Sequence, residues 1–318
     1  MAGSRQGASN AGVVVAVVGP TASGKTSLAI RLAQSLSTDV VSADARQVYQ
    51  SMPIGTAAPT AEECAQATHH LTEFLPPSTL YSAGAFEQDA VPLLDQLCET
   101  RGSAILCGGS GMYVKAALEG LDPLPADLAI RNTLNARLKA EGLAPLVEEL
   151  AALDPLHCGT MDTQNPQRVI RALEVCLASG KPFSSFHQGQ PKARNWRAIQ
   201  VGLRPERSWL RERIALRANA MMEAGWLDEV RALLPHEGQN ALNTVGYKEL
   251  FAHLKGELSL EEAVELLITH TRQFAKRQLT WFQKDPNVQW FDFNESTQAD
   301  ALNEAHDWVL NACKDMRP

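Results

Sequence analysis

The chain has 318 residues, of which 45% are hydrophobic, and its formal net charge is −7. That apolar content excludes a generally disordered chain, and the length allows two domains or one large domain with an insertion. The negative charge argues mildly against a nucleic-acid partner. However, residues 165–217 hold eleven Lys and Arg against three Glu, so a basic region lies on an otherwise acidic protein. Such a region is either an electrostatic footprint for a polyanion or a solvated helix face.

The six cysteines and the N-terminal segment bear on the compartment. No two cysteines form a CxxC pair, so we expect neither a zinc site nor a disulfide framework, and a reducing cytoplasm fits best. Residues 1–11 are small and polar, and we expect a disordered tail there. The apolar run VVVAVV that follows is too short for a signal peptide or a membrane span, so we expect no membrane partner.

The first part of the chain alternates strand and helix patterns. A β-branched run at Val13–Val18 ends at a glycine loop, which predicts a buried parallel strand, and leucine spacing predicts a helix over Lys25–Leu36. Further strands are expected at Thr38–Asp44, at Ser103–Gly111 up to a second glycine turn, and at Trp196–Leu203. The helix MYVKAALEG follows the second glycine turn. This alternation predicts an α/β fold, in which a parallel sheet has helices on both faces.

The strand signal vanishes between residues 121 and 195. A Pro-rich connector is followed by helical patterns at Ile130–Glu141, Leu143–Leu153 and Pro166–Ser179. We therefore expect a helical insertion domain at 121–195, with 12–120 and 196–318 forming the core.

Two long helices are expected in the C-terminal part. The first runs from Pro205 towards Leu234, with Pro near its first turn. The second runs from Ser259 to about Lys284, and Ser259 and Glu262 stand at the spacing of a capping box. A last strand is expected at NVQWFDF, residues 287–293.

A phosphate-binding loop of full consensus, GPTASGKT, follows the first predicted strand and opens the first predicted helix. Its glycines let backbone N–H groups converge on phosphate oxygens, and the helix N-terminus adds the positive end of its dipole. Lys25 would neutralise phosphate charge, and the Thr26 hydroxyl suits Mg²⁺, the expected cofactor. The predicted phosphate-binding set is Gly19, Pro20, Thr21, Ala22, Ser23, Gly24, Lys25 and Thr26.

Hydrolysis of a nucleoside triphosphate at such a loop usually also needs an acidic residue at the end of an apolar strand. The candidate strand AILC ends instead in Gly108–Gly109, and the well-placed acid is Asp44, after the second predicted strand. A carboxylate there would accept a proton from a nucleophile, coordinate Mg²⁺, or cap the residues that follow it. We therefore expect a phosphorylated ligand but an incomplete hydrolytic apparatus, although some small-molecule kinases place an acid as Asp44 is placed.

Two helices carry charge in notable places. Arg217 falls within the apolar stripe of Leu210, Ile214 and Met221, where an unpaired charge is costly. It should therefore meet an anion, either a protein carboxylate or a ligand phosphate. On the last long helix, a basic face suits a phosphodiester backbone, and it consists of Arg272, Lys276, Arg277 and Thr280. Nearby Trp281 would either stack on a base or lie in the core or at its edge.

Together the motifs resemble the tRNA dimethylallyltransferases of the bacterial type, and the match covers nearly the whole chain after the tail. The segments that carry it are GPTASGKT, SADARQVYQSMPIGTAAPT, HHLTEF, YSAGAF, GGSGMY, NPQRVIRALEV, TVGYKEL and TRQFAKRQLTWF. The resemblance implies a P-loop-type core that holds dimethylallyl diphosphate and an insertion that grips the tRNA anticodon arm. It also implies transfer of the dimethylallyl group to the exocyclic amine of the adenosine immediately 3′ of the anticodon, with that base flipped into a channel.

The resemblance also assigns roles to single residues. Lys25, Thr26 and Arg217, with Mg²⁺, would neutralise the departing diphosphate, and Asp44 would orient the adenine amine and act as general base. Ser110 stands where the family usually has Thr, which keeps a hydroxyl, whereas Ala45 departs from the family motif and removes a possible hydroxyl contact. The residues expected to contact tRNA, from the resemblance and from the basic helix face, are Asp44, Ala45, Arg46, Gln47, Ser110, Arg131, Gln167, Arg168, Val169, Ile170, Arg171, Asn243, Thr244, Val245, Gly246, Tyr247, Lys248, Arg272 and Arg277. Arg168 and Arg171 share a helix face, which fits either a backbone-gripping role or salt bridges within a bundle.

Three functions compete for this sequence: prenyl transfer to tRNA, phosphoryl transfer by a small-molecule or nucleotide kinase, and RNA binding on a degenerate nucleotide fold. The missing strand-end acid and the basic segments disfavour the kinase. The intact Lys25, Thr26 and Asp44 disfavour the non-catalytic protein. No exposed apolar stripe is evident in the sequence, so we expect a monomer.

Overall fold

The structure, a computed structural model, describes residues 12–186, 189 and 191–316. The tail predicted at 1–11 lies outside the described residues. The chain divides into two compact units, one formed by residues up to Leu118 together with those from Ala193 onward, and the other by Glu119–Lys192. None of the helices in the described part of the chain is long and apolar enough to cross a membrane.

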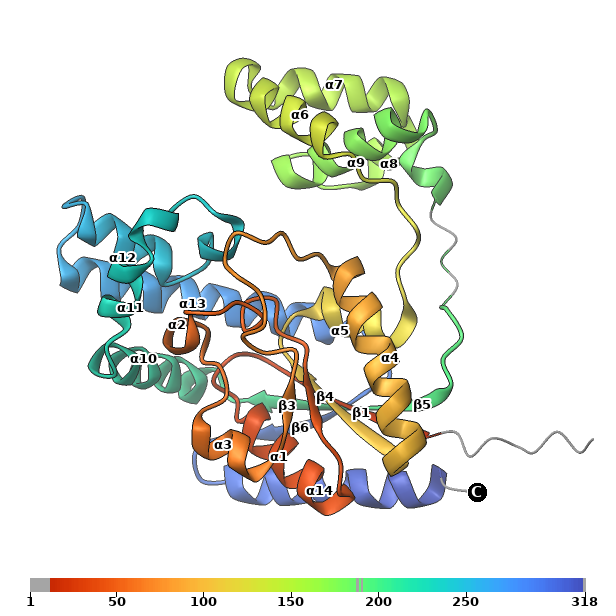
Figure 1. Ribbon diagram of the computed structural model, residues 1–318, viewed down its shortest axis with the longest axis vertical. Helices are drawn as coiled ribbons and strands as arrows, with labels where there is room; N and C mark the ends of the chain where they lie inside the picture. The colour runs from red at the N-terminus through yellow and green to blue at the C-terminus, as the bar shows by residue number, and fades with distance from the viewer. Residues whose placement is uncertain (1–11, 187–188, 190, 317–318) are drawn as a thin grey trace, which may run out of the picture. The chain divides into compact units, whose positions relative to one another are not determined.

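The first unit is built on a parallel sheet with strand order β3-β2-β4-β1-β5-β6 (Figure 1). Val15 of the inner strand β1 pairs with Ile105 of β4 on one side and with Ile199 of β5 on the other. The strands are β1 (Gly12–Val18), β2 (Val40–Ser42), β3 (His69–His70), β4 (Ser103–Gly108), β5 (Trp196–Pro205) and β6 (Val288–Phe293). The α/β fold class is confirmed, although β2 is shorter than predicted and the edge strand β3 was not predicted.

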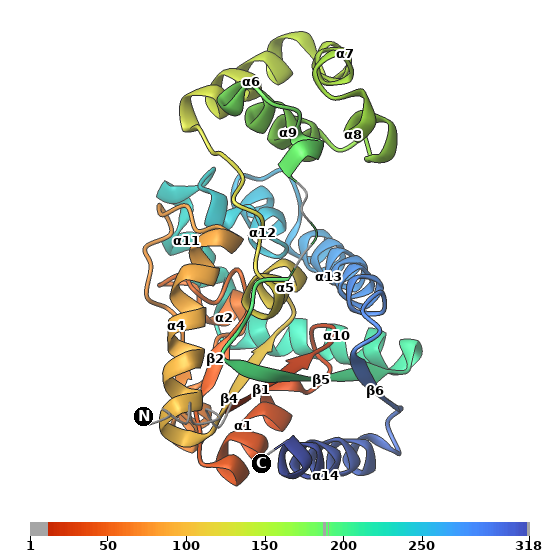
Figure 2. The same ribbon diagram turned by 90° about the vertical axis from the view of Figure 1, so that its right-hand side faces the viewer.

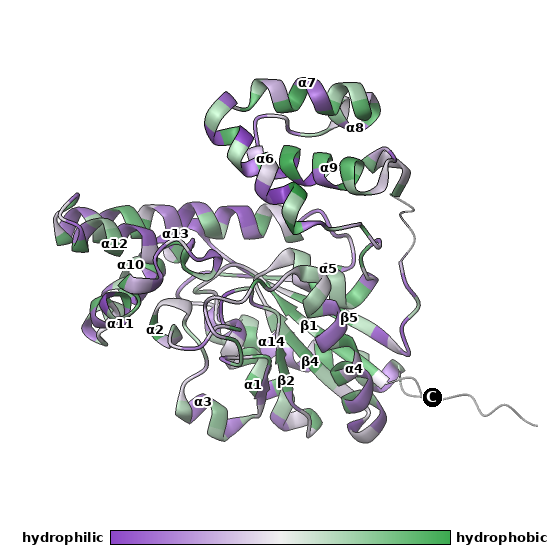
Figure 3. Cartoon of the chain, turned by 45° about the horizontal axis from the view of Figure 1, so that its top comes forward, coloured by the Kyte–Doolittle hydropathy of each residue, from purple (hydrophilic) through white to green (hydrophobic). Residues whose placement is uncertain are grey.

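Alternate side chains of β1 divide the core of this unit into two layers. Val13, Val15 and Val17 pack on one face of the sheet with α1 (Lys25–Leu36) and α14 (Gln298–Met316). The intervening β1 residues pack on the other face with α4 (Ala83–Arg101) and α5 (Gly111–Glu119). Figure 2 shows α1 and α14 below the sheet and α5 above it, and Figure 3 shows the inner strands β1 and β4 mostly in the green of apolar residues. The predicted two-faced helical cover is therefore confirmed.

A third hydrophobic cluster joins four helices that follow β5. They are α10 (Arg207–Glu223), α11 (Trp226–Ala232), α12 (Tyr247–Leu254) and α13 (Leu260–Phe282). The single helix predicted from Pro205 towards Leu234 is wrong, because Gly225 takes a φ of 96° and separates α10 from α11. The predicted capping box of α13 is confirmed, since the Ser259 hydroxyl accepts from Glu262 N–H and the Glu262 carboxylate accepts from Ser259 N–H.

The segment between β2 and α4 starts at the carboxyl end of β2 and includes the edge strand β3. It contains two short helices, α2 (Pro53–Thr56) and α3 (Ala61–Gln66). The carboxylate of Glu229 on α11 accepts from the N–H groups of Ile54 and Gly55, at 2.7 and 2.9 Å, and so ties α2 to the third cluster.

The second unit is a small helical bundle with its own core, built around Leu146, Leu150 and Leu173. Its helices are α6 (Leu128–Glu141), α7 (Ala144–Leu153), α8 (Pro155–Thr160) and α9 (Pro166–Ser179), followed by the 3₁₀ turn η1 (Phe183–Phe186). Its first and last residues are hydrogen-bonded to each other, because Lys192 N–H donates to the Glu119 carbonyl at 2.7 Å.

Candidate active site

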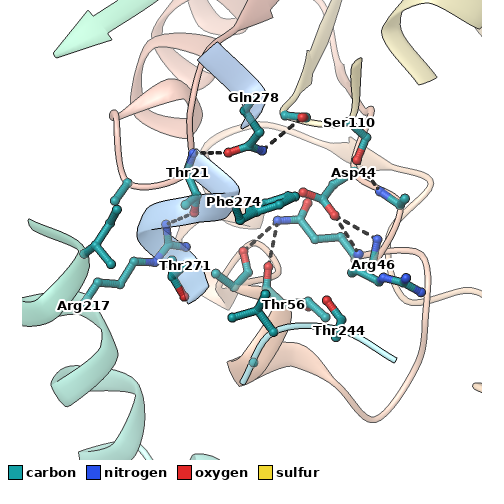
Figure 4. Close-up of a pocket in the computed structure, with 18 of the residues that line it drawn as sticks. Thr21, Asp44, Arg46, Thr56, Ser110, Arg217, Thr244, Thr271, Phe274 and Gln278 are labelled. Atoms are coloured by element: carbon teal, nitrogen blue, oxygen red, sulfur yellow. Dashed lines mark hydrogen bonds between the residues drawn. The ribbon is translucent and has the colours of Figure 1, made fainter. Parts of the chain in front are cut away.

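A cavity of about 470 Å³ opens at the carboxyl ends of β1, β2 and β4 in the first unit (Figure 4). This is the edge where ligands bind in open parallel α/β sheets, because the connecting loops diverge there. The predicted catalytic residues Lys25, Thr26, Asp44 and Arg217 all line it, as do Thr21, Ser110 and Gln278. Residues far apart in the sequence thus share one cavity.

The phosphate-binding loop turns sharply between β1 and α1. Gly19 and Gly24 adopt φ values of 144° and 90°, which glycine tolerates and most residues do not. A side chain at Gly19 would also meet the Leu203 carbonyl at 2.7 Å. The Ser23 hydroxyl is buried and has no hydrogen-bond partner among the described residues. These features leave a tight loop of backbone N–H groups at the N-terminus of α1, as expected of an anion site.

Lys25 lies at the first position of α1 and folds back over the loop. Its Nζ atom donates to the Pro20 carbonyl at 2.6 Å. Burial lowers the pKa of Lys25 to about 8, and Arg217 contributes in the same direction, whereas Asp44 acts to raise the pKa. The site thus holds a lysine whose positive charge is not fully neutralised, which favours an anionic ligand.

Asp44 follows β2 and belongs to the loop that leads to α2. One carboxylate oxygen, Oδ1, accepts from the N–H groups of Arg46 and Gln47, at 2.8 and 3.4 Å. No hydrogen bond of the described residues uses Oδ2, and Asp44 lines the cavity. The capping role and a chemical role are therefore compatible, because one oxygen fixes the turn and the other is free to accept a proton.

Arg217 reaches the cavity from α10. Leu210 and Ile214, which precede Arg217 on the same helix, are buried in one hydrophobic cluster with Ala275 of α13. It forms no ion pair with any residue that the structure describes, and its hydrogen bond to the Thr21 hydroxyl is long, at 3.5 Å. Burial lowers the pKa of Arg217, with Asp44 acting in the opposite direction. The protein-carboxylate alternative is therefore wrong for the described residues, and contact with a ligand phosphate stays a prediction.

The second glycine turn packs against the loop that carries Asp44. Gly108 has no room for a side chain, because a Cβ there would lie 2.1 Å from the Ala43 carbonyl. The hydroxyl of Ser110 accepts from Ala45 N–H at 2.9 Å. Ser110 thus positions backbone next to Asp44, a role that needs the hydroxyl oxygen and not its proton.

Sequence reasoning missed Gln278, which is 5% exposed on α13. Its side chain joins two loops that line the cavity: Oε1 accepts from Thr21 N–H at 2.8 Å and Nε2 donates to the Gly109 carbonyl at 3.0 Å. The available signal was a polar residue on the buried face of a helix, at three positions beyond Ala275 and four before Phe282.

The predicted tRNA-contacting residues of the first unit divide by exposure. Asn243, Lys248 and Arg277 are exposed, and all three line the cavity. Tyr247 is buried and donates to the Glu229 carboxylate. Gln47 is half-buried, lines the cavity and donates from its side-chain amide to the Thr56 and Ala57 carbonyls. The Arg272 guanidinium donates to the Arg211 carbonyl, and the Arg46 guanidinium to the Asn240 carbonyl. Thr244, Val245 and Gly246 complete this stretch, with Gly246 buried against Trp226.

In the second unit, the predicted contact residues lie on or beside α9. Arg131 and Arg171 both pair with the buried Glu174, so the salt-bridge alternative holds for Arg171. Gln167 and Arg168 are exposed beside a hollow of about 460 Å³, and Arg168 lies 3.8 Å from Asp162. Val169 and Ile170 lie in the core of the bundle, so their side chains are not available to a partner.

Comparisons with known proteins identify the family of this chain. The family model described as IPP transferase matches residues 47–285. The chain is 46% identical to a tRNA dimethylallyltransferase of Christiangramia forsetii, over 90% of this chain and 95% of that protein. It is 43% identical to the tRNA dimethylallyltransferase of Cytophaga hutchinsonii, over 92% and 96%. The crystal structure of a tRNA isopentenylpyrophosphate transferase from Bacillus halodurans is similar, with a TM-score of 0.71 and 35% identity over 95% of this chain and 97% of that one. The chain therefore belongs to the IPP transferase family.

Proposed function

We propose that this protein transfers the dimethylallyl group of dimethylallyl diphosphate to the exocyclic amine of the adenosine immediately 3′ of the anticodon in tRNA. The observation that supports it most is a cavity lined by Lys25, by Arg217, which forms no ion pair with the described residues, and by Asp44, whose Oδ2 makes no hydrogen bond with them. Two cations suit a leaving diphosphate, and one carboxylate suits an incoming amine. The curated relatives are named tRNA dimethylallyltransferases.

In the proposed reaction, the adenine nitrogen attacks the first carbon of the dimethylallyl group while the bond from that carbon to the diphosphate oxygen breaks. Negative charge grows on the departing pyrophosphate, where Lys25, Arg217 and the N–H groups of the phosphate loop stabilise it. The nitrogen then carries an extra proton, and Asp44 Oδ2 takes it. Pyrophosphate and the alkylated adenosine are the products.

Mg²⁺ is part of the proposal, and the residues present fit it. Thr26 is the second residue of α1 and lines the cavity, and its hydroxyl makes no side-chain hydrogen bond with the described residues. The described residues contain no cluster of three or more His, Cys, Asp or Glu that would form an all-protein cage. Such a site suits Mg²⁺, which commonly binds through one or two protein oxygens and substrate phosphates. When bound, the ion would add positive charge to the leaving diphosphate.

We propose that tRNA contacts both units. In the first unit the exposed candidates are Asn243, Lys248 and Arg277, with Trp281, whose side chain is 41% exposed, available for base stacking. In the second unit they are Gln167 and Arg168. A cytoplasmic location also belongs to this proposal, because a tRNA-modifying enzyme works where its substrate is. We also propose a monomer, because no exposed apolar stripe is evident in the sequence.

The test is incubation of the protein with unmodified tRNA, Mg²⁺ and dimethylallyl diphosphate, followed by mass spectrometry of the nucleosides. We expect one five-carbon unit on adenosine and an equal amount of released pyrophosphate. ATP turnover without RNA modification would support the kinase instead, and tRNA binding with neither reaction would support the non-catalytic protein.

A further inference from the structure

The buried amide of Gln278 connects two loops that do different work in the proposed reaction. One loop, residues 19–24, would bind the diphosphate. The other, the turn at Gly108–Ser110, holds the segment that carries Asp44. Gln278 Oε1 accepts from Thr21 N–H, and Gln278 Nε2 donates to the Gly109 carbonyl. Figure 4 shows this side chain between Thr21 and Ser110 at the cavity wall.

The connection continues beyond Gly109 without a break. The next residue, Ser110, accepts from Ala45 N–H through its hydroxyl and donates its own N–H to the Ala43 carbonyl, at 3.2 Å. Ala43 and Ala45 are the two neighbours of Asp44 in the chain. A series of short hydrogen bonds therefore runs from the phosphate loop through Gln278 and Ser110 to the backbone on either side of Asp44.

The packing around Gln278 leaves the amide little freedom. The residue is 5% exposed, and a Cβ added at Gly109 would lie 2.1 Å from Gln278 Nε2, so glycine at 109 is what admits the amide. Both polar ends of the side chain are satisfied, which fixes its orientation, since a flipped amide would face a donor with a donor. A side chain held in this way sets a distance, because neither loop can shift without breaking a buried bond.

We propose, on the basis of the function proposed above, that Gln278 is a positioning residue that holds the diphosphate loop and the Asp44 segment at the separation that the transfer requires. In this proposal Gln278 acts through its hydrogen bonds to Thr21 and Gly109, and not through a contact of its own with the diphosphate or the base. Alkyl transfer needs the amine and the reacting carbon in line at close range, and small displacements of one partner cost large factors in rate. Loss of the amide should therefore lower kcat and leave the affinities for both substrates nearly intact.

The test compares Gln278→Met with Gln273→Met. Methionine keeps the length and volume of glutamine without its hydrogen bonds, and Gln273 is exposed on the same helix. We expect Gln278→Met to lower kcat at least tenfold, with KM for dimethylallyl diphosphate and for tRNA changed less than about threefold, and Gln273→Met to match the wild type. An unchanged kcat, or a loss confined to KM, would overturn the proposal.

A second variant tests the hydrogen bond between Gln278 and Gly109 by a change at Gly109. Gly109→Ala should displace the amide of Gln278 while leaving that residue in place, because its added methyl group takes the position of Nε2. We expect the same loss of kcat, and the double variant should be no slower than either single variant, since all three break one connection. Fully additive losses would contradict the proposed connection.

A third measurement does not depend on prenyl transfer. Inorganic pyrophosphate should slow amide hydrogen exchange in residues 19–24 and 43–47 of the wild type. In Gln278→Met we expect protection at 19–24 to remain and protection at 43–47 to be lost. Retained protection at 43–47 would overturn the positioning role even if the wild type transferred no prenyl group. A wild type that modifies no tRNA but shows this coupling would overturn the proposed function alone.

Discussion

The Nη1 atom of Arg217 lies 3.5 Å from the Thr21 hydroxyl oxygen, so a cation from α10 faces the phosphate loop. None of the described acidic residues forms an ion pair with it. A buried charge without a counter-charge is costly, and the cost falls when an anion binds. Binding of an anionic ligand would therefore offset part of the cost of burying the Arg217 charge.

Arg217→Ala should weaken the use of dimethylallyl diphosphate. The loss should be on the order of 1.5–3 kcal/mol, the range for hydrogen bonds to charged groups, and it should appear in kcat/KM for the diphosphate. The matched control is Arg213→Ala, because Arg213 is exposed on the same helix and its guanidinium lies over the Trp209 ring. Equal kinetics for the two variants would rule out a ligand-binding role for Arg217.

Asp44→Asn should stop the chemistry and spare the fold. The amide oxygen can still accept from Arg46 N–H, so the turn after β2 should survive. It cannot take the proton of the alkylated amine, so turnover should fall by roughly 10²–10⁴, the usual contribution of a general base. Binding of tRNA, measured by filter retention, should change little. A variant that binds tRNA normally and also turns over normally would show that another group accepts the proton.

Affinity for pyrophosphate should depend on pH through Lys25. Burial lowers the pKa of this lysine to about 8 in the free protein, so its charge is present below pH 8 and is lost as the pH rises through that value. A bound anion favours the charged form, so binding above pH 8 should take up a proton and become weaker. Calorimetry in two buffers with different ionisation enthalpies measures that proton.

The control for the pH dependence is Lys25→Arg, because arginine keeps its charge throughout this range. The titration of pyrophosphate itself contributes equally to both proteins and cancels in the comparison. Identical pH profiles for wild type and Lys25→Arg would show that Lys25 does not titrate between pH 7 and 9.

Glu174→Ala should destabilise the helical unit. The Glu174 carboxylate accepts from Arg131, Arg171 and Asp127 N–H, and its side chain is 1% exposed. Burial acts to raise the pKa of Glu174, but these hydrogen bonds outweigh it and hold the pKa below its usual value. Removal of one partner from such a group costs about 3 kcal/mol or more, and partial exposure of both arginines favours the low end of that range.

The same carboxylate should make the unit sensitive to acid. Because the folded-state pKa is lowered, the stabilisation is complete above the ordinary pKa of glutamate and is lost as the pH falls through the folded-state value. Urea unfolding is measured at pH 7 and at pH 3, with proteolysis within residues 119–192 as the readout. The difference in free energy of unfolding between wild type and Glu174→Ala should be smaller at pH 3. A difference independent of pH would mean that packing, not charge, causes the loss.

Local patterns were enough to predict the loop and the strand end that line the cavity of the first unit. The loop from Gly19 to Thr26 is defined by residues adjacent in sequence, and Asp44 could be placed because strand ends of a parallel sheet share one edge. Gln278 and Glu229 could not be found in this way, since their partners lie 257 and 175 residues away. A buried glutamine on an apolar helix face has the sequence pattern of a core position, and its partners are backbone atoms that carry no sequence signal.

Burial also separates residues that motif matching had grouped into one contact segment. The stretch Gln167–Arg171 was predicted as one contact segment, yet helical periodicity places Val169 and Ile170 in the core and leaves Gln167 and Arg168 outside. The break at Gly225 was missed because the residues on either side continue a helical pattern. Only the positive φ of the glycine, which the pattern does not encode, separates α10 from α11.

The hydrogen bond between Lys192 and Glu119 joins the two ends of the helical bundle, so the chain enters and leaves the bundle at one point. All residues that line the cavity of the first unit lie outside the bundle. Excision of residues 120–191 with a short glycine bridge would therefore remove none of the described strands and none of the residues that line this cavity. The chain thus has the layout of a core with one removable insert, so excision of the bundle would separate the tRNA contacts proposed for the bundle from those proposed for the core.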